Sequence, residues 1–387
     1  MRKKIWHATE VVWRLNFFVG VICCCGDLGP LIRADECVVD TESQFSQLRE
    51  AIEEVRVQAE IPGLVYAYTQ GLDVVELKAL GIRKVGDETP MTAEDLMHIG
   101  SCTKAMTAAL LATLVAERKL AWSTKLVDLF PSASEMIHPD YHAVTLELLL
   151  RHRAGLPANI SWGELVGNTA TEQRYDMLSR VLAKPAPTTP ATAFGYSNVG
   201  YALAGLMAEK VTGKSWEQLM TERIFTPLGM TSAGFGPPGP LGKVKQPWGH
   251  RQVQLEFVPD QVDNPPSLGP AGTVHCSVAD WAKFAQIFTN DGRKENPVLE
   301  ESMVERLVSL VEKDDRYALG WTVVDRKWAD GVTYSHRGSN TRWYCNVWIS
   351  PELNLTFLVA ANVGNAAAGR ACDTVVVKML EHLKLLK

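Results

Sequence analysis

Short runs of apolar and β-branched residues, the pattern typical of β-strands, lie near both ends of this 387-residue chain. Residues 64–68 and 74–80 are separated by Gln70-Gly71 and predict a hairpin. Three further runs, at 318–325, 344–349 and 355–361, come late in the sequence. Because helical patterns dominate the chain between these groups, we predict an α+β fold. An antiparallel sheet is expected to be flanked by terminal helices, with a mostly helical lobe at about 105–235.

The spacing of the apolar residues also indicates where helices begin and end. From Asp40 onward one helical pattern continues until Pro62-Gly63 and places apolar residues at Phe45, Leu48, Ile52, Val55 and Ala59. A second helix is expected from Ser101 to about Lys119, and a third over 145–151. The last helix closes the chain near Lys387.

Composition and charge exclude several classes of protein. The hydrophobic share of 46% and the length are those of a globular chain that can bury a large core without a disulfide scaffold or a structural metal. Lys and Arg number 39 against 44 Asp and Glu, which gives a formal net charge of −5 and a pI near 6.0. Nucleic acid is therefore not an expected partner.

The N-terminus has the pattern of a secretory leader. Arg2, Lys3, Lys4 and Arg14 precede an apolar run at 17–25, which is too short to cross a bilayer as a helix. We predict a signal peptide over residues 1–34, with an uncleaved anchor as the alternative, and a mature domain over 35–387. Acylation at Cys23, Cys24 or Cys25 is less favoured. The protein is then expected to be exported, periplasmic or extracellular, and to meet a membrane only through this leader.

Metal-binding patterns are missing from the sequence. The predicted mature chain has five cysteines, Cys37, Cys102, Cys276, Cys345 and Cys372, without a C-x-x-C spacing. Buried free thiols are the favoured interpretation, and one disulfide is possible. His138 and His142 are four residues apart, but Pro139 between them breaks the helix that would align their rings. We therefore predict no metal site and no cofactor.

Ser101-Cys102-Thr103-Lys104 is the sequence's one Ser-x-x-Lys, and it lies where the second helix is expected to begin. Residues i and i+3 of a helix face the same side, so Lys104 can reach the Ser101 hydroxyl. A serine hydroxyl needs such a neighbour to become a good nucleophile. Alone, the motif also fits a helix-capping serine followed by a solvated lysine.

Two later segments make the catalytic interpretation more specific. Tyr196-Ser197-Asn198 follows 95 residues after Ser101, and His336-Arg337-Gly338-Ser339 follows 140 residues after Tyr196. A second Tyr-x-Asn, Tyr344 to Asn346, falls on a predicted strand and is interpreted as structural. Ser197 misses the Gly-x-Ser-x-Gly nucleophile motif by one residue, which disfavours an α/β-hydrolase.

These motifs, in this order, resemble those of the class C β-lactamase and penicillin-binding-protein family of serine hydrolases. That family also includes D-alanyl-D-alanine carboxypeptidases and β-lactamase-like esterases. Residues 149–157, 196–205 and 270–284 are similar to further family segments, and the resemblance covers about residues 40 to 385.

The resemblance implies a role for each motif residue. Ser101 would be the acylated nucleophile, with Lys104 and Tyr196 sharing proton transfer, and either could be the base. Asn198 would hold the substrate amide. The backbone N–H groups of Ser101 and Ser339 would form the oxyanion hole, and Gly338 would let the substrate approach the strand. His336 would belong to the substrate-binding strand.

The third motif departs from the Lys-Thr-Gly that β-lactamases of this class usually carry. A histidine near its ordinary pKa is mostly neutral at pH 7, so His336 does not replace the charge of a lysine. Arg337 or Arg342 could supply a cation for a carboxylate, although an exposed arginine on a solvated rim is the favoured interpretation. We predict an exported serine hydrolase acting on a β-lactam, a D-alanyl peptide or a small ester. A non-catalytic binding protein on the same fold is the alternative.

Overall fold

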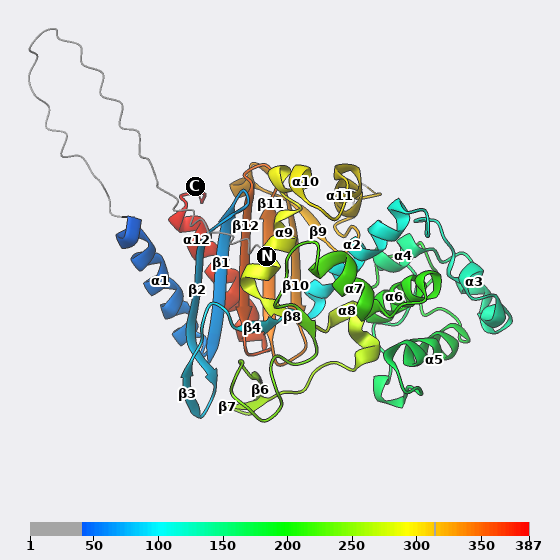
Figure 1. Ribbon diagram of the computed structural model, residues 1–387, viewed down its shortest axis with the longest axis horizontal. Coiled ribbons are helices and arrows are strands. Elements are labelled where there is room, and N and C mark those ends of the chain that lie inside the picture. The colour runs from blue at the N-terminus through cyan, green and yellow to red at the C-terminus, as the bar shows by residue number, and fades with distance from the viewer. Residues whose placement is uncertain (1–40, 313–314, 387) are drawn as a thin grey trace, which may run out of the picture. The chain divides into compact units, whose positions relative to one another are not determined.

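The computed structural model of the protein describes residues 41–312 and 315–386 (Figure 1). The predicted signal peptide, the predicted start of the domain at residue 35 and Cys37 lie outside the described residues. None of the helices in the described ranges is long and apolar enough to span a membrane.

The main sheet of the described chain has seven antiparallel strands in the order β3-β2-β1-β12-β11-β10-β9. Their bounds are Gly63–Gln70 (β1), Asp73–Lys84 (β2), Asp87–Pro90 (β3), Thr322–Arg326 (β9), Gly331–Ser339 (β10), Tyr344–Ser350 (β11) and Leu355–Ala361 (β12). The predicted hairpin is β1 and β2. Strand β1 also pairs with β12, with Leu64 opposite Ala361, so the two ends of the described chain close one sheet.

Both faces of the central strands are buried. Side chains alternate across a strand, so Leu64 and Tyr66 of β1 face one apolar core while Val65 and Ala67 face the other. The first core is covered by α1 (Thr41–Gln58) and α12 (Ala366–His382), which lie together on one face of the sheet (Figure 1). The second core is shared with the rest of the protein. The prediction of an α+β fold with terminal helices on the sheet is confirmed.

A helical lobe lies on the opposite side of the sheet from α1 and α12 (Figure 1). Its helices and those that connect it to the sheet are α2 (Thr103–Ala116), α3 (Leu126–Leu129), α4 (Leu146–Leu150), α5 (Ala170–Leu182), α6 (Asn198–Thr212), α7 (Trp216–Met220), α8 (Gly269–Gly272), α9 (Val278–Gln286), α10 (Asn290–Glu295) and α11 (Glu301–Val308). One continuous apolar core joins these helices to the inner face of the sheet.

Two smaller sheets connect the lobe to the main sheet. One has the order β4-β8-β5, with β4 at Leu96–His98, β8 at Val274–Ser277 and β5 at Gly234–Phe235. The other pairs β6 (Gly249–Val253) with β7 (Glu256–Asp260). Strand β4 leads directly to Ser101, and β8 follows the short helix α8, so both elements bring backbone close to the predicted nucleophile.

Two predicted boundaries are wrong. The strand predicted at 318–325 begins only at Thr322, because Gly320 adopts φ +87°, and a Cβ there would lie 2.8 Å from the Cα of Ala105. The helix predicted from Ser101 to Lys119 is shorter at both ends. Ser101 lies in a 3-10 turn, and α2 ends at Ala116, shortly before Arg118 takes a left-handed conformation with φ +58°.

Candidate active site

Ser101 lies in the 3-10 turn Gly100–Cys102, between the end of β4 and the start of α2. Gly100 has φ +48°, a conformation that favours glycine. A Cβ on Gly100 would also lie 2.4 Å from the backbone nitrogen of Ser339 at the end of β10. The absence of a side chain at position 100 therefore brings the nucleophile turn against β10.

Lys104 is completely buried beneath Ser101, on the first turn of α2. Its Nζ lies 3.1 Å from Ser101 Oγ, 2.7 Å from Asn198 Oδ1 and 2.7 Å from the carbonyl oxygen of Ala271. The last two atoms only accept hydrogen bonds. A neutral amine can donate its two protons to them and direct its lone pair at the Ser101 hydroxyl.

Burial makes this neutral form available. Desolvation lowers the pKa of the Lys104 ammonium well below its usual value. Among the described residues, no carboxylate forms an ion pair with it to oppose that shift. The arrangement can therefore move the Ser101 proton onto Lys104.

Tyr196 also hydrogen-bonds to the Ser101 side chain, and the centroid of its ring lies 4.9 Å from Lys104 Nζ. Although 37% of Tyr196 is exposed, burial raises the pKa of its phenol far above the usual range, and the Ser101 hydrogen bond offsets only part of that shift. The phenol is thus neutral and can donate a proton. Of the two bases left open by the sequence, the contacts and the pKa directions favour Lys104.

Asn198 begins α6 and connects Lys104 to the loop that follows α4. Its Oδ1 accepts from Lys104, and its Nδ2 donates to Asn159 Oδ1 at 2.8 Å. Asn198 therefore orients the lysine, and one N–H of its amide is left for the substrate contact that the resemblance implies.

Gly338 and Ser339 lie at the end of β10, where the sheet has an open edge. Strand β9 pairs with β10 only from Gly331 to Ser335, so the remaining residues of β10 pair on one side, with β11. The structure adds a second reason for glycine at 338, beside the substrate approach that the resemblance implies. A Cβ there would lie 2.0 Å from the Ile99 carbonyl oxygen, so Gly338 is also needed for packing against the nucleophile turn. This packing brings the Ser101 and Ser339 backbones together.

A buried polar cluster supports both halves of this backbone contact. His98 Nδ1 accepts from the Gly100 N–H at 3.1 Å, and its Nε2 lies 2.8 Å from Asp263 Oδ1. Asp263 Oδ1 also accepts from Asn340 Nδ2 at 3.0 Å. Asp263 therefore connects the residue before Ser101 to the residue after Ser339.

Comparison with known proteins agrees with this geometry. A family model described as Beta-lactamase matches residues 48–378. The chain belongs to the Beta-lactamase family. Penicillin-binding protein 4 of Amycolatopsis lactamdurans is 26% identical over 333 residues, which cover 83% of this chain and 86% of that protein. The unguisins hydrolase ungD' of Aspergillus campestris (strain IBT 28561) is 29% identical over 58% of this chain, but the match spans only 43% of that hydrolase.

Solved structures share the Beta-lactamase fold of this chain. A crystal structure of SurE has a TM-score of 0.73 at 24% identity and covers 88% of this chain and 76% of SurE. The octameric penicillin-binding protein homologue from Pyrococcus abyssi has a TM-score of 0.71 at 23% identity, over 87% of this chain and 77% of that one. At these identities the likeness concerns the fold.

His336, which stands where many members of the Beta-lactamase family have lysine, is engaged inside the protein. Its Nδ1 donates to the Arg337 carbonyl oxygen at 2.8 Å, and its Nε2 accepts from the Tyr317 hydroxyl at 3.0 Å. Burial lowers the pKa of His336 to about 3, so the ring is neutral. Both ring nitrogens of His336 therefore have partners inside the protein, and the residue still lines the cavity beside Tyr196.

The two arginines considered for carboxylate binding are both in ion pairs. Arg337 lies 2.8 Å from Asp373, and Arg342 lies 3.2 Å from Asp260. The second Tyr-x-Asn packs against α12, where Asn346 Nδ2 donates to Asp373 at 2.9 Å. Its interpretation as structural agrees with that contact.

Several site residues were not assigned roles from the sequence. Asn159, Tyr317 and Asp263 carry no motif, and the Ala271 contact uses only a backbone oxygen. The resemblance of residues 270–284 was the one signal that pointed to the Ala271 segment. Within 41–312 and 315–386, no three His, Cys, Asp or Glu side chains gather as metal ligands. The cysteines described there, Cys102, Cys276, Cys345 and Cys372, are buried free thiols.

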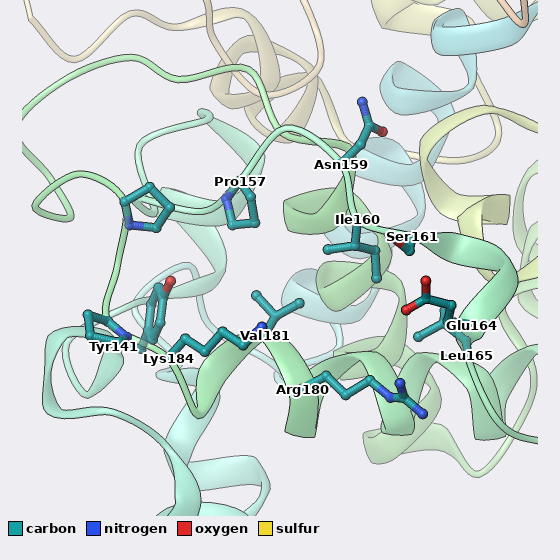
Figure 2. A pocket seen from close by; sticks show the side chains of 12 residues that line it. Tyr141, Pro157, Asn159, Ile160, Ser161, Glu164, Leu165, Arg180, Val181 and Lys184 are labelled. Carbon is teal, nitrogen blue, oxygen red and sulfur yellow. The ribbon is translucent and has the colours of Figure 1, made fainter.

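Two cavities flank the catalytic cluster. One of about 560 Å³ lies behind the Asn159 loop and is mainly apolar, and Figure 2 shows the Asn159 amide pointing away from Ile160 and Val181. The other, of about 450 Å³, is lined by Tyr196, His336 and Arg337. The second cavity therefore shares a wall with the reacting groups, and the first is separated from Lys104 by the loop itself.

Proposed function

We propose that this protein is an exported serine hydrolase that cleaves an amide or ester through an acyl-enzyme on Ser101. A β-lactam, a D-alanyl peptide and a small carboxylic ester are the candidate substrates. The observation that carries the proposal is the contact set of Lys104 Nζ, which has two fixed acceptors and Ser101 Oγ within 3.1 Å. A buried lysine held in this way can act as a base at neutral pH.

The reaction follows from these positions. Ser101 transfers its proton to Lys104 while Oγ attacks the substrate carbonyl carbon, and the resulting oxyanion lies between the backbone N–H groups of Ser101 and Ser339. The bond to the leaving group then breaks, and the leaving nitrogen or oxygen takes a proton from the Lys104–Tyr196 pair. Water attacks the acyl-enzyme in the second half, which releases the acid and restores Ser101.

Named relatives support this proposal. One is named a penicillin-binding protein and another a hydrolase, and neither name decides the substrate of this chain. Residues 1–34 support export by their basic start and short apolar run. N-terminal sequencing of the protein from the medium or periplasm would test export, and a start at Met1 in the cytosol would contradict it.

The test of the hydrolase is intact mass measured after exposure to excess penicillin, with the loss of free penicillin followed in the same sample. We expect an adduct or turnover that disappears in Ser101→Ala and persists in Ser161→Ala, an exposed serine on a nearby loop. A lasting adduct would indicate a peptidase, and rapid consumption a lactamase.

The same pair of variants is then tested with a D-alanyl-D-alanine peptide and a nitrophenyl ester. Turnover that requires Ser101 would assign the substrate class. If none of the three compounds is cleaved or bound covalently at Ser101, the hydrolase proposal is wrong, and a binding protein on this fold is left.

A further inference from the structure

The cavity of about 560 Å³ behind the loop at 157–165 is not used by the reaction proposed for Ser101 (Figure 2). The loop forms one wall, and the end of α5 with the segment that follows it forms the other. Ile160, Leu165 and Val181 give both walls apolar surface. A cavity of this size, mainly apolar and with a few polar groups, is typical of small-molecule sites.

One of those polar groups, the Tyr141 hydroxyl, has no hydrogen-bond partner among the described residues. Tyr141 is only 1% exposed and lines the cavity, and Figure 2 shows its hydroxyl directed toward the loop wall at Pro157. Burial raises the pKa of Tyr141 to about 12, so the phenol is neutral and can donate its proton. An unpaired hydroxyl in an apolar setting costs free energy, which a ligand that accepts its hydrogen bond would recover.

A cation lies on the same side of the cavity as Tyr141. The carboxylate of Asp140 accepts from the Ala186 N–H at 3.0 Å, which holds the turn of Tyr141 against the segment of Lys184. Lys184 is exposed and lines the cavity, and in the described part of the chain no carboxylate pairs with it. Glu164, the one acid among the described lining residues, lies at the other end of the cavity (Figure 2). The Tyr141 end is therefore suited to a carboxylate.

The loop between this cavity and the catalytic cluster is hydrogen-bonded to Asn198. The Asn198 N–H donates to the Ala158 carbonyl oxygen at 2.9 Å, and its Nδ2 donates to Asn159 Oδ1 at 2.8 Å. Asn198 Oδ1 in turn accepts from Lys104 Nζ. Contacts made behind the loop can therefore reach the residue that orients the base.

We propose that this cavity binds a small apolar carboxylate as an activator, with the Tyr141 hydroxyl and the Lys184 ammonium binding the carboxylate. The apolar body of the ligand packs between Ile160 and Val181 and holds the loop against Asn198. The cavity and the catalytic cluster are then two distinct sites with a coupling free energy between them. Binding does not depend on the reaction at Ser101, whereas the activation rests on the proposed function.

Calorimetry with 4-phenylbutyrate and 4-phenylbutyramide tests the site, because these probes share an apolar body and differ in charge. We expect the Kd of the carboxylate to be about tenfold lower, and this preference to vanish in Tyr141→Phe/Lys184→Gln. Tyr141→Phe removes only an unpartnered hydroxyl, so the variant should fold normally. Tyr175→Phe/Lys294→Gln, at exposed residues of α5 and α10, is the control that keeps the preference. Equal Kd values, or a preference that survives at Tyr141 and Lys184, would overturn the site.

Acylation of Ser101 by a reactive ester tests the activation. Saturating 4-phenylbutyrate should raise the acylation rate about fivefold, and this rise should be absent in Tyr141→Phe/Lys184→Gln. Asn159→Ala should still bind the probe but respond less, because its side chain no longer joins the loop to Asn198. Binding without a change in rate would overturn the activator role. If the probe binds with the expected preference but no ester acylates Ser101, the site stands and the proposed hydrolase is wrong.

Discussion

The inner and outer sides of Ser101 are built in opposite ways. On the inner side, Lys104 is completely buried and its nitrogen is held by Asn198 and the Ala271 carbonyl. On the outer side, Arg316 and Arg326 are exposed, and in the described chain no carboxylate pairs with them. A buried group whose hydrogen bonds are made within the protein, such as Lys104, performs the same chemistry on any substrate. Exposed groups such as Arg316 and Arg326 can be replaced without disturbing that chemistry. The difference indicates that reaction type and substrate choice are encoded in separate parts of this site.

Replacing the inner base should have the largest effect. We expect Lys104→Met to lower the rate of Ser101 acylation by about a thousandfold, because the general base is lost and its two acceptors, Asn198 Oδ1 and the Ala271 carbonyl, are left without this donor. Tyr196→Phe should cost less, about ten- to a hundredfold, since it removes a proton donor and leaves the base. Stopped-flow acylation with a reactive ester measures both, and the exposed Lys119→Met is the control.

Comparing the two losses of activity tests the assignment of Lys104 as the base. A larger loss in Tyr196→Phe than in Lys104→Met would make Tyr196 the base. Thermal unfolding of each variant is needed, because Lys104→Met is expected to destabilise the protein by a few kcal/mol through its unpaired neighbours.

Replacing Asp263 should cause the next largest loss of activity, although this residue lies outside every motif. Asp263→Ala removes the group that joins His98 to Asn340, so the backbone amides of Ser101 and Ser339 lose part of their alignment. We expect kcat to fall by tens of fold with KM little changed, since the oxyanion forms after binding. Asp263→Asn, which keeps one acceptor oxygen, should recover part of the loss.

A purely structural role for Asp263 predicts another result. The melting temperature would then fall while kcat per folded molecule stayed normal. Asp325→Asn, at an exposed aspartate on β9, controls for the change of charge alone.

Most of the residues on the inner side of Ser101 could be predicted from the sequence. Few of the residues that hold them in place could be predicted in this way. Ser101 and Lys104 are three residues apart, so their contact follows from local geometry, and the resemblance added Tyr196 and Asn198. Asp263 and the Ala271 oxygen act across long stretches of chain and through backbone atoms, which leave no motif. The packing of Gly338 against Ile99 likewise has no sequence signal, because it joins residues far apart in the chain.

The same contrast between local and long-range contacts decides which parts of the fold could be predicted. The hairpin of β1 and β2 and the helices α1 and α12 agree with apolar spacing, which depends on nearby residues. The strand predicted at 318–325 failed at Gly320, where close packing on Ala105 in α2 decides the backbone conformation. Contacts of this kind are set by the assembled core.

The pH dependence of acylation should report the inner side alone. The Lys104 amine must be neutral to accept the Ser101 proton, and burial lowers its pKa, so kcat/KM should rise with pH and level off well below 10.5. On the acid side of that limb the rate falls about tenfold per pH unit. His336, with a pKa of about 3, should contribute no inflection near 6.5.

His336→Gln checks this assignment, since its amide oxygen can still accept from Tyr317. The acid limb should keep its midpoint in this variant. A limb that shifts or vanishes with His336, or a rate still rising at pH 10, would contradict the neutral buried lysine.

The smallest effect is expected at Asn159, where the inner side meets the apolar cavity of Figure 2. Asn159→Ala removes the acceptor of Asn198 Nδ2, an exposed hydrogen bond of 2.8 Å, and should lower acylation about three- to tenfold. Ser161→Ala on the same loop should leave the rate unchanged. Asn159→Asp keeps the acceptor oxygen but adds a negative charge near Lys104, which favours the ammonium. Its rate at high pH should therefore match the parent while its acid limb moves upward. If both variants lost the same activity at every pH, the loop rather than the Asn198 hydrogen bond would be responsible.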